Sequence, residues 1–123
     1  RQDGQMAEIV WTEPALDDLE EIANYIALDK LSAAQRLVQK IFDRIDLLSE
    51  SPNSGRRVPE LSRSKYKEVI VGPCRIFYRF SDDTVYVLHV MRAEREMRKY
   101  MLQDRDLKGT SIKSKRHDVS TYF

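Results

Sequence analysis

Residues 67–91 read KEVIVGPCRIFYRFSDDTVYVLHVM, three runs rich in β-branched and aromatic residues that only two short turns separate, Gly72-Pro73 and Ser81-Asp82-Asp83. Turns this short join neighbouring strands as antiparallel hairpins, because parallel strands need a crossover of a dozen or more residues. The sequence therefore predicts a three-stranded antiparallel meander with strands at Lys67–Val71, Arg75–Phe80 and Thr84–Met91.

Two helices are predicted before this meander. Thr12 is a suitable N-cap for the first, and apolar residues then recur at helical spacing as far as Ile26. Ser32 with Gln35 forms a capping box for the second helix, which residues 51–55 (SPNSG) end. Helices joined by so short a link are expected to form an antiparallel hairpin.

The remaining segments complete an α+β architecture. Glu8–Trp11 is a plausible N-terminal strand, and Arg92–Leu102 is predicted to form a short C-terminal helix. Residues 1–5 are expected to be a cloning remnant, so the domain spans residues 6–102. The polar, basic tail at residues 103–123 is expected to be disordered, cloning-derived, or ordered only on a partner. The predicted fold is a helical hairpin packed on a small antiparallel sheet.

Composition excludes several classes of protein. With 123 residues, 41% of them hydrophobic, the chain suits one domain, and its apolar runs are too short to cross a membrane. Cys74 is the only cysteine, which rules out an internal disulfide and fits the reducing cytoplasm. There is no glycine-rich phosphate loop, and His89 and His117 have no cysteine partners. We expect no cofactor and no metal.

Charge is distributed unevenly along the chain. Residues 13–50 hold nine acidic and four basic side chains, whereas residues 56–102 hold eleven basic and six acidic ones. Strand alternation places Arg75, Phe77 and Arg79 on one face of the sheet. That face either binds a nucleic acid or an acidic peptide, or its arginines pair with acidic residues of the same chain or snorkel at a sheet edge. On the next strand, alternation predicts a shared face for Val85, Val87, His89 and Met91.

At family level, the sequence resembles the ParE/RelE superfamily of toxins from bacterial type II toxin–antitoxin systems. The resemblance covers roughly Ala7 to Leu102 and is carried by WTEPALDDLEEIANYIA, by SAAQRLVQKIFDRIDLLSESPNSGRRVPEL and by YKEVIVGPCRIFYRFSDDTVYVLHVMR. VGPCRIFYR is similar to the diagnostic strand pair of the family, with Cys74 in place of the usual aromatic residue. The resemblance implies the same α+β fold.

The superfamily divides into ribosome-dependent mRNA endonucleases, which are RelE-like, and ParE-like poisons of DNA gyrase. The RelE pattern implies a basic pair at Lys67 and Val69, so its second lysine is absent. Arg75 matches the strand arginine, but Ala93 stands where an active-site arginine is expected. The expected tyrosine position is Lys99, and Tyr100 lies one place beyond it.

The resemblance therefore implies a cytoplasmic, ParE-like plasmid-stabilization toxin that inhibits DNA gyrase and is neutralised by a cognate antitoxin in a hetero-oligomeric complex. One alternative is a RelE-like endonuclease acting on ribosome-bound mRNA; another is a non-toxic binding module of the same fold. The expected target or antitoxin contacts are Arg75, Phe77, Arg79, Arg92 and Arg95, and the expected antitoxin contacts on the helical hairpin are Leu19, Ile22, Ile26, Leu37 and Ile41. If the protein is a nuclease, the expected catalytic residues are Lys67, Arg75, Arg95, His89 and Tyr100.

Overall fold

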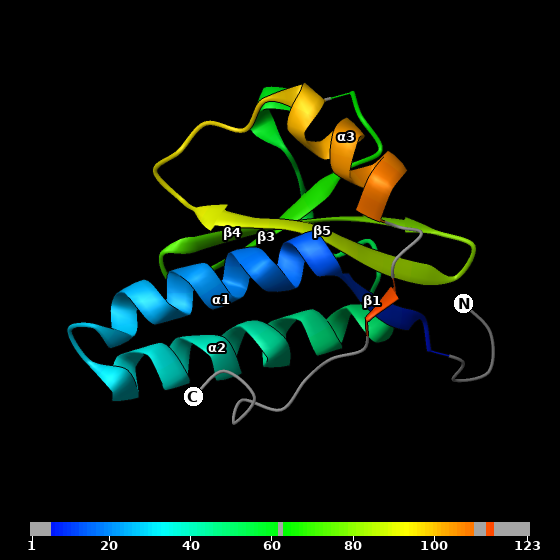
Figure 1. The fold of residues 1–123 in the computed structure, drawn as a ribbon. Coiled ribbons are helices and arrows are strands. Elements are labelled where there is room, and N and C mark those ends of the chain that lie inside the picture. Colours follow the sequence, from blue (N-terminus) through cyan, green and yellow to red (C-terminus); the bar gives the residue numbers. More distant parts are fainter. Residues whose placement is uncertain (1–5, 62, 110–112, 115–123) are drawn as a thin grey trace.

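One mixed sheet organises the chain, with strand order β2-β3-β4-β5-β1-β6 (Figure 1). The computed structural model describes residues 6–61, 63–109 and 113–114. The strands are β1 (Glu8–Thr12), β2 (Arg56–Arg57), β3 (Lys67–Val71), β4 (Cys74–Ser81), β5 (Thr84–Arg92) and β6 (Lys113–Ser114). The helices are α1 (Glu13–Ala27), α2 (Leu31–Asp46) and α3 (Lys99–Gly109), with 3₁₀ turns η1 (Leu47–Ser49) and η2 (Pro59–Leu61).

The predicted meander is confirmed, since β3, β4 and β5 pair antiparallel in sequence order. A two-residue turn joins β4 to β5, and both of its residues have positive φ, 50° at Asp82 and 58° at Asp83. Aspartate tolerates this left-handed conformation, which matches the twist of a tight hairpin. The predicted first strand is also present, and it pairs with β5 in parallel, with Trp11 opposite Val87.

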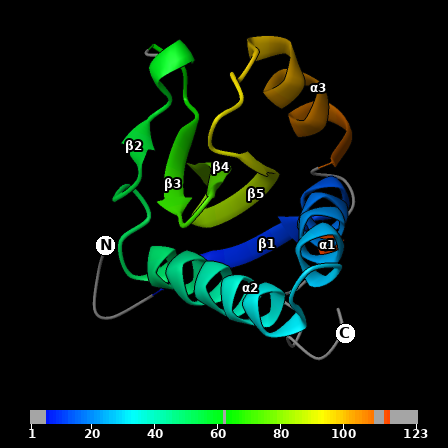
Figure 2. The ribbon, with the colours of Figure 1, turned by 90° about the vertical axis from the view of Figure 1, so that its left-hand side faces the viewer.

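Helices α1 and α2 cover one face of the sheet as the predicted hairpin (Figures 1 and 2). The Thr12 hydroxyl caps α1, because its oxygen accepts a hydrogen bond from the Ala15 amide at 3.4 Å. The predicted capping box of α2 is wrong. The Lys30 carbonyl accepts the amides of Ala33 and Ala34, so Lys30 is the N-cap and Ser32 already lies within the first turn.

The main hydrophobic core lies between these helices and the sheet. Trp11 and Phe42 are both fully buried there, with ring centroids 5.1 Å apart and planes at 72°. This edge-to-face arrangement is one that aromatic pairs prefer. The core is continuous from β1 through α1 and α2 to the inner face of β3, β4 and β5.

The opposite face of the sheet, on which the sequence predicted Arg75, Phe77 and Arg79, is covered too. Helix α3 lies over it (Figure 2) and, with Val58, Leu61 and Tyr66, contributes to a second cluster. The predicted C-terminal helix runs from Lys99 to Gly109 rather than from Arg92 to Leu102. The Ala93 amide instead donates to the Pro73 carbonyl at 2.7 Å. Backbone pairing therefore continues one residue past the end of β5. The second cluster consists of Val58, Tyr66, Phe77, Leu88, Met91, Met97 and Leu102.

Part of the segment 103–123 is assigned to secondary structure. Residues 103–109 belong to α3, and β6 pairs antiparallel with β1. Residues 1–5, expected to be a cloning remnant, and residues 115–123 lie outside the described part of the chain.

A β-bulge in β5 changes which residues share a face. Phe77 pairs with His89 while the next residue, Tyr78, pairs with Val87, so Leu88 is the extra residue. The predicted common face of Val85, Val87, His89 and Met91 is therefore wrong beyond Val87. Val85, Val87 and Val90 pack toward α1 and α2, whereas Leu88 and Met91 belong to the cluster under α3.

Among the described residues, the helices are all too short or too polar to cross a membrane.

Candidate functional site

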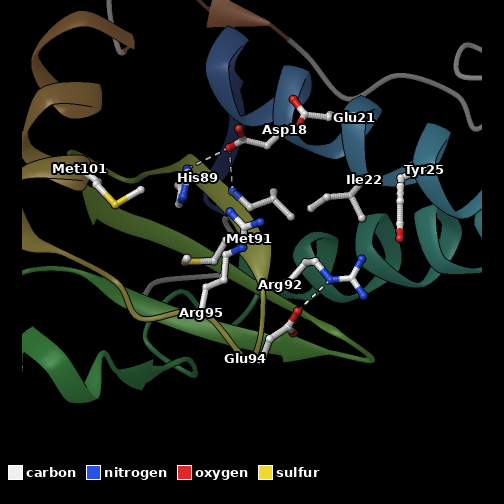
Figure 3. Close-up of a pocket in the computed structure, with 11 residues that line it drawn as sticks. Asp18, Glu21, Ile22, Tyr25, His89, Met91, Arg92, Glu94, Arg95 and Met101 are labelled. Carbon is white, nitrogen blue, oxygen red and sulfur yellow. Dashed lines mark hydrogen bonds and ion pairs between the residues drawn. The ribbon is translucent and has the colours of Figure 1, made fainter.

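A partly enclosed groove of about 540 Å³ lies between α1, the end of β5 and α3 (Figure 3). Helix α1 contributes its outer side, β5 contributes its last residues beyond the bulge, and Met101 comes from α3. Arg92 and Arg95, two of the predicted binding residues, line it together with His89. The full lining is Asp18, Glu21, Ile22, Tyr25, His89, Val90, Met91, Arg92, Glu94, Arg95 and Met101.

The middle of the groove combines apolar surface with a basic group. Tyr25 is 65% exposed, and the Arg92 guanidinium carbon lies 5.6 Å from the centre of its ring. Arg92, which is half-buried, also donates from Nε to the exposed Glu94 at 2.9 Å. Solvent screens an ion pair of the exposed Glu94, so a carboxylate from another chain can replace Glu94 at little cost.

The inner end of the groove is a polar junction of α1, β5 and α3. Asp18 accepts hydrogen bonds from the Val90 amide at 3.0 Å and from both terminal nitrogens of Arg105. Arg105 also donates to the carbonyl of the bulge residue Leu88 at 3.1 Å. His89 Nδ1 lies 2.9 Å from Asp18 Oδ2, in a direction unsuited to a hydrogen bond.

This junction fixes the charge of Asp18. Burial alone would raise the pKa of the Asp18 carboxyl, but the contacts with His89, Arg105 and the Val90 amide outweigh burial and lower it. His89 is only 5% exposed. The bulge thus directs His89 toward a structural contact with α1, and the Asp18–Arg105 pair ties α1 to α3.

Arg75 is buried and paired within the chain. It donates from Nε to Glu68 at 2.7 Å and from Nη1 and Nη2 to Glu60 at 2.9 and 2.7 Å. Glu68 is fully buried and also accepts from Arg56 at 2.6 Å. Hydrogen bonding to Arg75 lowers the pKa of Glu60 to about 2, against the opposing effect of burial. Hydrogen bonding to Glu60 raises the pKa of Arg75.

Arg79 is paired as well, and its partner lies in α3. It donates from Nε to Asp106 at 2.7 and 3.0 Å, and its guanidinium stacks 4.3 Å from the centre of the Tyr86 ring. Asp106 also accepts from the Tyr66 hydroxyl at 3.1 Å. Burial and the Asp106 charge raise the pKa of Tyr66 to about 12. Of the two alternatives left open for the strand arginines, the structure shows pairing within the chain.

Of the residues named for a nuclease, His89 and Arg95 line the groove and Arg75 donates to the Arg95 carbonyl, but Lys67 and Tyr100 lie apart from them. Ile70 is the cross-strand partner of Arg75, whereas Lys67 is the partner of Tyr78, on the other face of the sheet. His89 contacts Asp18, and Tyr100 is 66% exposed and lines neither the groove nor the pocket at Arg75.

Several residues named for binding are core residues. Phe77 is fully buried under α3, and Leu19, Leu37 and Ile41 are buried between the helices and the sheet. Residues at these helical positions face the sheet because they form the apolar stripe by which the hairpin packs. Ile22 and Ile26 are half-buried, and Ile22 lines the groove.

Sequence reasoning missed the exposed apolar residues beside this stripe. Tyr25, Leu28 and Leu31 are 65%, 86% and 50% exposed around the tip of the hairpin. In the sequence, an aromatic residue and two leucines at this end of the helices could have indicated the exposed surface, because solvated helix ends usually carry polar residues. Asp106 was also missed, because it lies in the segment expected to be a tail.

Comparison with known proteins agrees with this architecture. Residues 9–97 match the family described as "ParE toxin of type II toxin-antitoxin system, parDE". Toxin RelE2 of Caulobacter vibrioides is 36% identical over 91 residues, covering 73% of this chain and 99% of the relative. Putative toxin Y4kP of Sinorhizobium fredii is 42% identical over 89 residues, covering 72% of this chain and 90% of the relative.

Solved structures share the fold. The chromosomal ParDE toxin–antitoxin system of P. aeruginosa contains a chain with TM-score 0.61 and 24% identity, matched over 74% of this chain and 100% of that one. The toxin–antitoxin complex RelBE2 of Mycobacterium tuberculosis contains one with TM-score 0.51 and 19% identity, matched over 77% and 100%.

Fold and sequence together define a toxin of a type II toxin–antitoxin system, of the ParE/RelE superfamily. Within it, the chain belongs to the ParE toxin family.

Proposed function

We propose that this toxin acts in the cytoplasm as a non-enzymatic inhibitor of DNA gyrase, that a cognate antitoxin neutralises it, and that the pair serves plasmid stabilization. The observation that carries the proposal is the pairing of Arg75. Its guanidinium is bound by Glu60 and Glu68, and the basic residue that the nuclease pattern places beside it, Lys67, lies on the opposite face of the sheet.

The chemistry of RNA cleavage supports this choice. Stabilising the charge that develops on a phosphate during strand cleavage requires donors that are preorganised around the reacting group. At Arg75, two carboxylates offset the positive charges of Arg56 and Arg75 and occupy donors that a phosphate would need. Ala93 lines the same pocket without adding a cation. This arrangement suits binding more than phosphoryl chemistry.

The groove beside α1 is the proposed antitoxin contact. It joins Tyr25 and two methionines to the half-buried Arg92, a combination that fits a peptide carrying apolar and acidic side chains. Both solved relatives come from systems in which a toxin assembles with an antitoxin. A segment that is disordered when free and folds into the groove would combine shape with charge complementarity.

A supercoiling assay tests the target. Purified toxin is expected to inhibit DNA supercoiling by purified gyrase, and equimolar antitoxin is expected to restore it. Toeprinting on translating ribosomes is run in parallel with the same preparation. Normal supercoiling together with codon-linked mRNA cuts would favour the endonuclease, and expression without antitoxin that leaves growth unchanged would favour the non-toxic module.

A further inference from the structure

Three N–H groups converge on one carboxylate beside the end of β5. Arg75 donates from Nη1 and Nη2 to the two Glu60 oxygens at 2.9 and 2.7 Å, and the Met97 amide donates to Glu60 Oε2 at 2.9 Å. A guanidinium fork with an added backbone donor is a geometry that recognises carboxylates and phosphates. Glu60 therefore occupies a built anion site of its own chain.

The donors are fixed more firmly than the carboxylate they hold. The Arg75 side chain is 6% exposed, and it is anchored from behind by the fully buried Glu68 and by the Arg95 carbonyl. Glu60 is 26% exposed and projects from η2, a turn of three residues. Displacing Glu60 exposes the cradle without dismantling the sheet, since Arg75 keeps its bonds to Glu68 and Arg95.

The anion site opens to the surface next to the groove. A pocket of about 310 Å³ leads to it, with Pro59, Ala93 and the 45%-exposed Ile70 forming its apolar walls. Arg75 is the cross-strand partner of Met91, a groove residue, and Ala93 directly follows groove residue Arg92. Cross-strand neighbours lie about 5 Å apart, so one extended segment can occupy the groove and reach the anion site.

The walls and the charges favour a peptide over a nucleic acid. Nucleic-acid phosphates are bound by several cations that neutralise a series of charges. The described cations of this pocket, Arg56 and Arg75, are already matched by Glu68 and Glu60. One guanidinium fork beside apolar walls fits a single carboxylate on an aliphatic stem.

We propose that the Arg75–Met97 cradle is a carboxylate-exchange site, in which an acidic side chain of the antitoxin replaces Glu60. This inference rests on the proposed antitoxin partner. Because one carboxylate replaces another, all three N–H donors keep a hydrogen-bond acceptor. Glu60 then competes with the antitoxin side chain from within the same chain. The apparent affinity for the antitoxin then equals the intrinsic affinity multiplied by the fraction of time that the cradle is free of Glu60.

A small carboxylate tests the site without any partner. Glu60→Ala vacates the cradle, and its thermal unfolding temperature and Met97 amide NMR signal are followed during titration with acetate. We expect a lowered unfolding temperature, a saturable rise toward the wild-type value with acetate, and no equivalent effect of chloride at equal ionic strength. The control Glu96→Ala removes an exposed carboxylate next to Met97 in sequence and is expected to show no acetate response.

Two results of the titration would overturn the inference. One is an acetate response of Glu60→Ala that does not exceed that of wild type. The other is saturable binding of inorganic phosphate but not of acetate, which would indicate a nucleic-acid phosphate as occupant. If Glu60→Ala does not fold, Glu60→Gln gives the same comparison, because a neutral amide competes less strongly for the guanidinium.

Measurements of antitoxin binding distinguish the exchange site from the proposed function. Glu60→Gln is expected to tighten antitoxin binding by about tenfold, and replacing one acidic antitoxin residue by its amide is expected to abolish that gain. Tight antitoxin binding that Glu60→Gln leaves unchanged would overturn the exchange site and leave the proposed function standing. Failure of the wild-type chain to bind the antitoxin would contradict both.

Discussion

Arg79 in β4 and Asp106 in α3 form a two-point ion pair, with Arg79 Nε 2.7 and 3.0 Å from the two carboxylate oxygens. The pair joins a strand whose arginines were predicted as binding residues to the part of α3 that was predicted as a tail. It also explains how a helix with little apolar surface stays on the sheet. Arg105, the preceding residue, ties the same helix to Asp18 of α1.

Removing the Asp106 charge is therefore expected to loosen α3. Asp106→Asn should lower the free energy of unfolding by about 2 kcal/mol, because Arg79 and Tyr66 each lose a charged hydrogen-bond acceptor. Chemical denaturation measures this change. Gln103→Ala, on the exposed side of α3, is the control and should stay within about 0.5 kcal/mol of wild type. Equal stability of the two variants would mean that the pair does not hold the helix.

The pH dependence of stability follows from Glu60. Its pKa in the folded chain lies at about 2, below its usual value of 4.5, so its contribution is fully present above pH 4.5. That contribution is lost as the pH falls through about 2. Denaturation curves between pH 6 and pH 2 should show wild-type stability falling more steeply than that of Glu60→Gln. Parallel curves for the two proteins would contradict the assignment.

Much of the fold was predictable from local pattern. Helical spacing up to Ile26 and the two short turns around β4 determine the hairpin and the meander, because each pattern allows few arrangements. Helix α3 was misplaced because ion pairs through Arg105 and Asp106 hold it, and hydrophobic periodicity does not detect such pairs. The bulge at Leu88 was also hidden, since the apolar letters of β5 continue through it without a break.

The candidate site was less predictable than the fold. Arg92 and Arg95, predicted as binding residues, both line the groove, but strand alternation left the environment of Arg75 open. Its partners Glu60 and Glu68 lie in segments whose positions in space depend on the whole sheet. The exposure of Tyr25 depends on the orientation of α1 about its own axis relative to β5. A sequence pattern does not determine this orientation.

The groove should account for much of the affinity for the antitoxin. Tyr25→Ala is expected to weaken antitoxin binding roughly tenfold, because truncating an exposed aromatic anchor removes packing that forms only in the complex. Leu47→Ala is the control, since Leu47 is 56% exposed outside the groove. Calorimetric titration gives both affinities. Equal affinities for the two variants would place the antitoxin elsewhere on the toxin.

Toxicity should not depend on the residues named for proton transfer and phosphate binding. The double variant Lys67→Ala with Tyr100→Phe is expected to arrest growth within about twofold of wild type, because neither residue contacts the Arg75 site. A nuclease that used them would lose roughly 10²-fold or more. Growth inhibition after titrated induction measures the difference, with protein levels checked by immunoblot.

The central claim is that this toxin acts on DNA topology without cleaving RNA. The most direct measurement is the superhelicity of a reporter plasmid after toxin induction without antitoxin, with messenger RNA ends mapped in the same culture. We predict that the plasmid loses negative supercoils while the mapped ends stay unchanged. Normal superhelicity, accompanied by new ends aligned to codons, would contradict the claim.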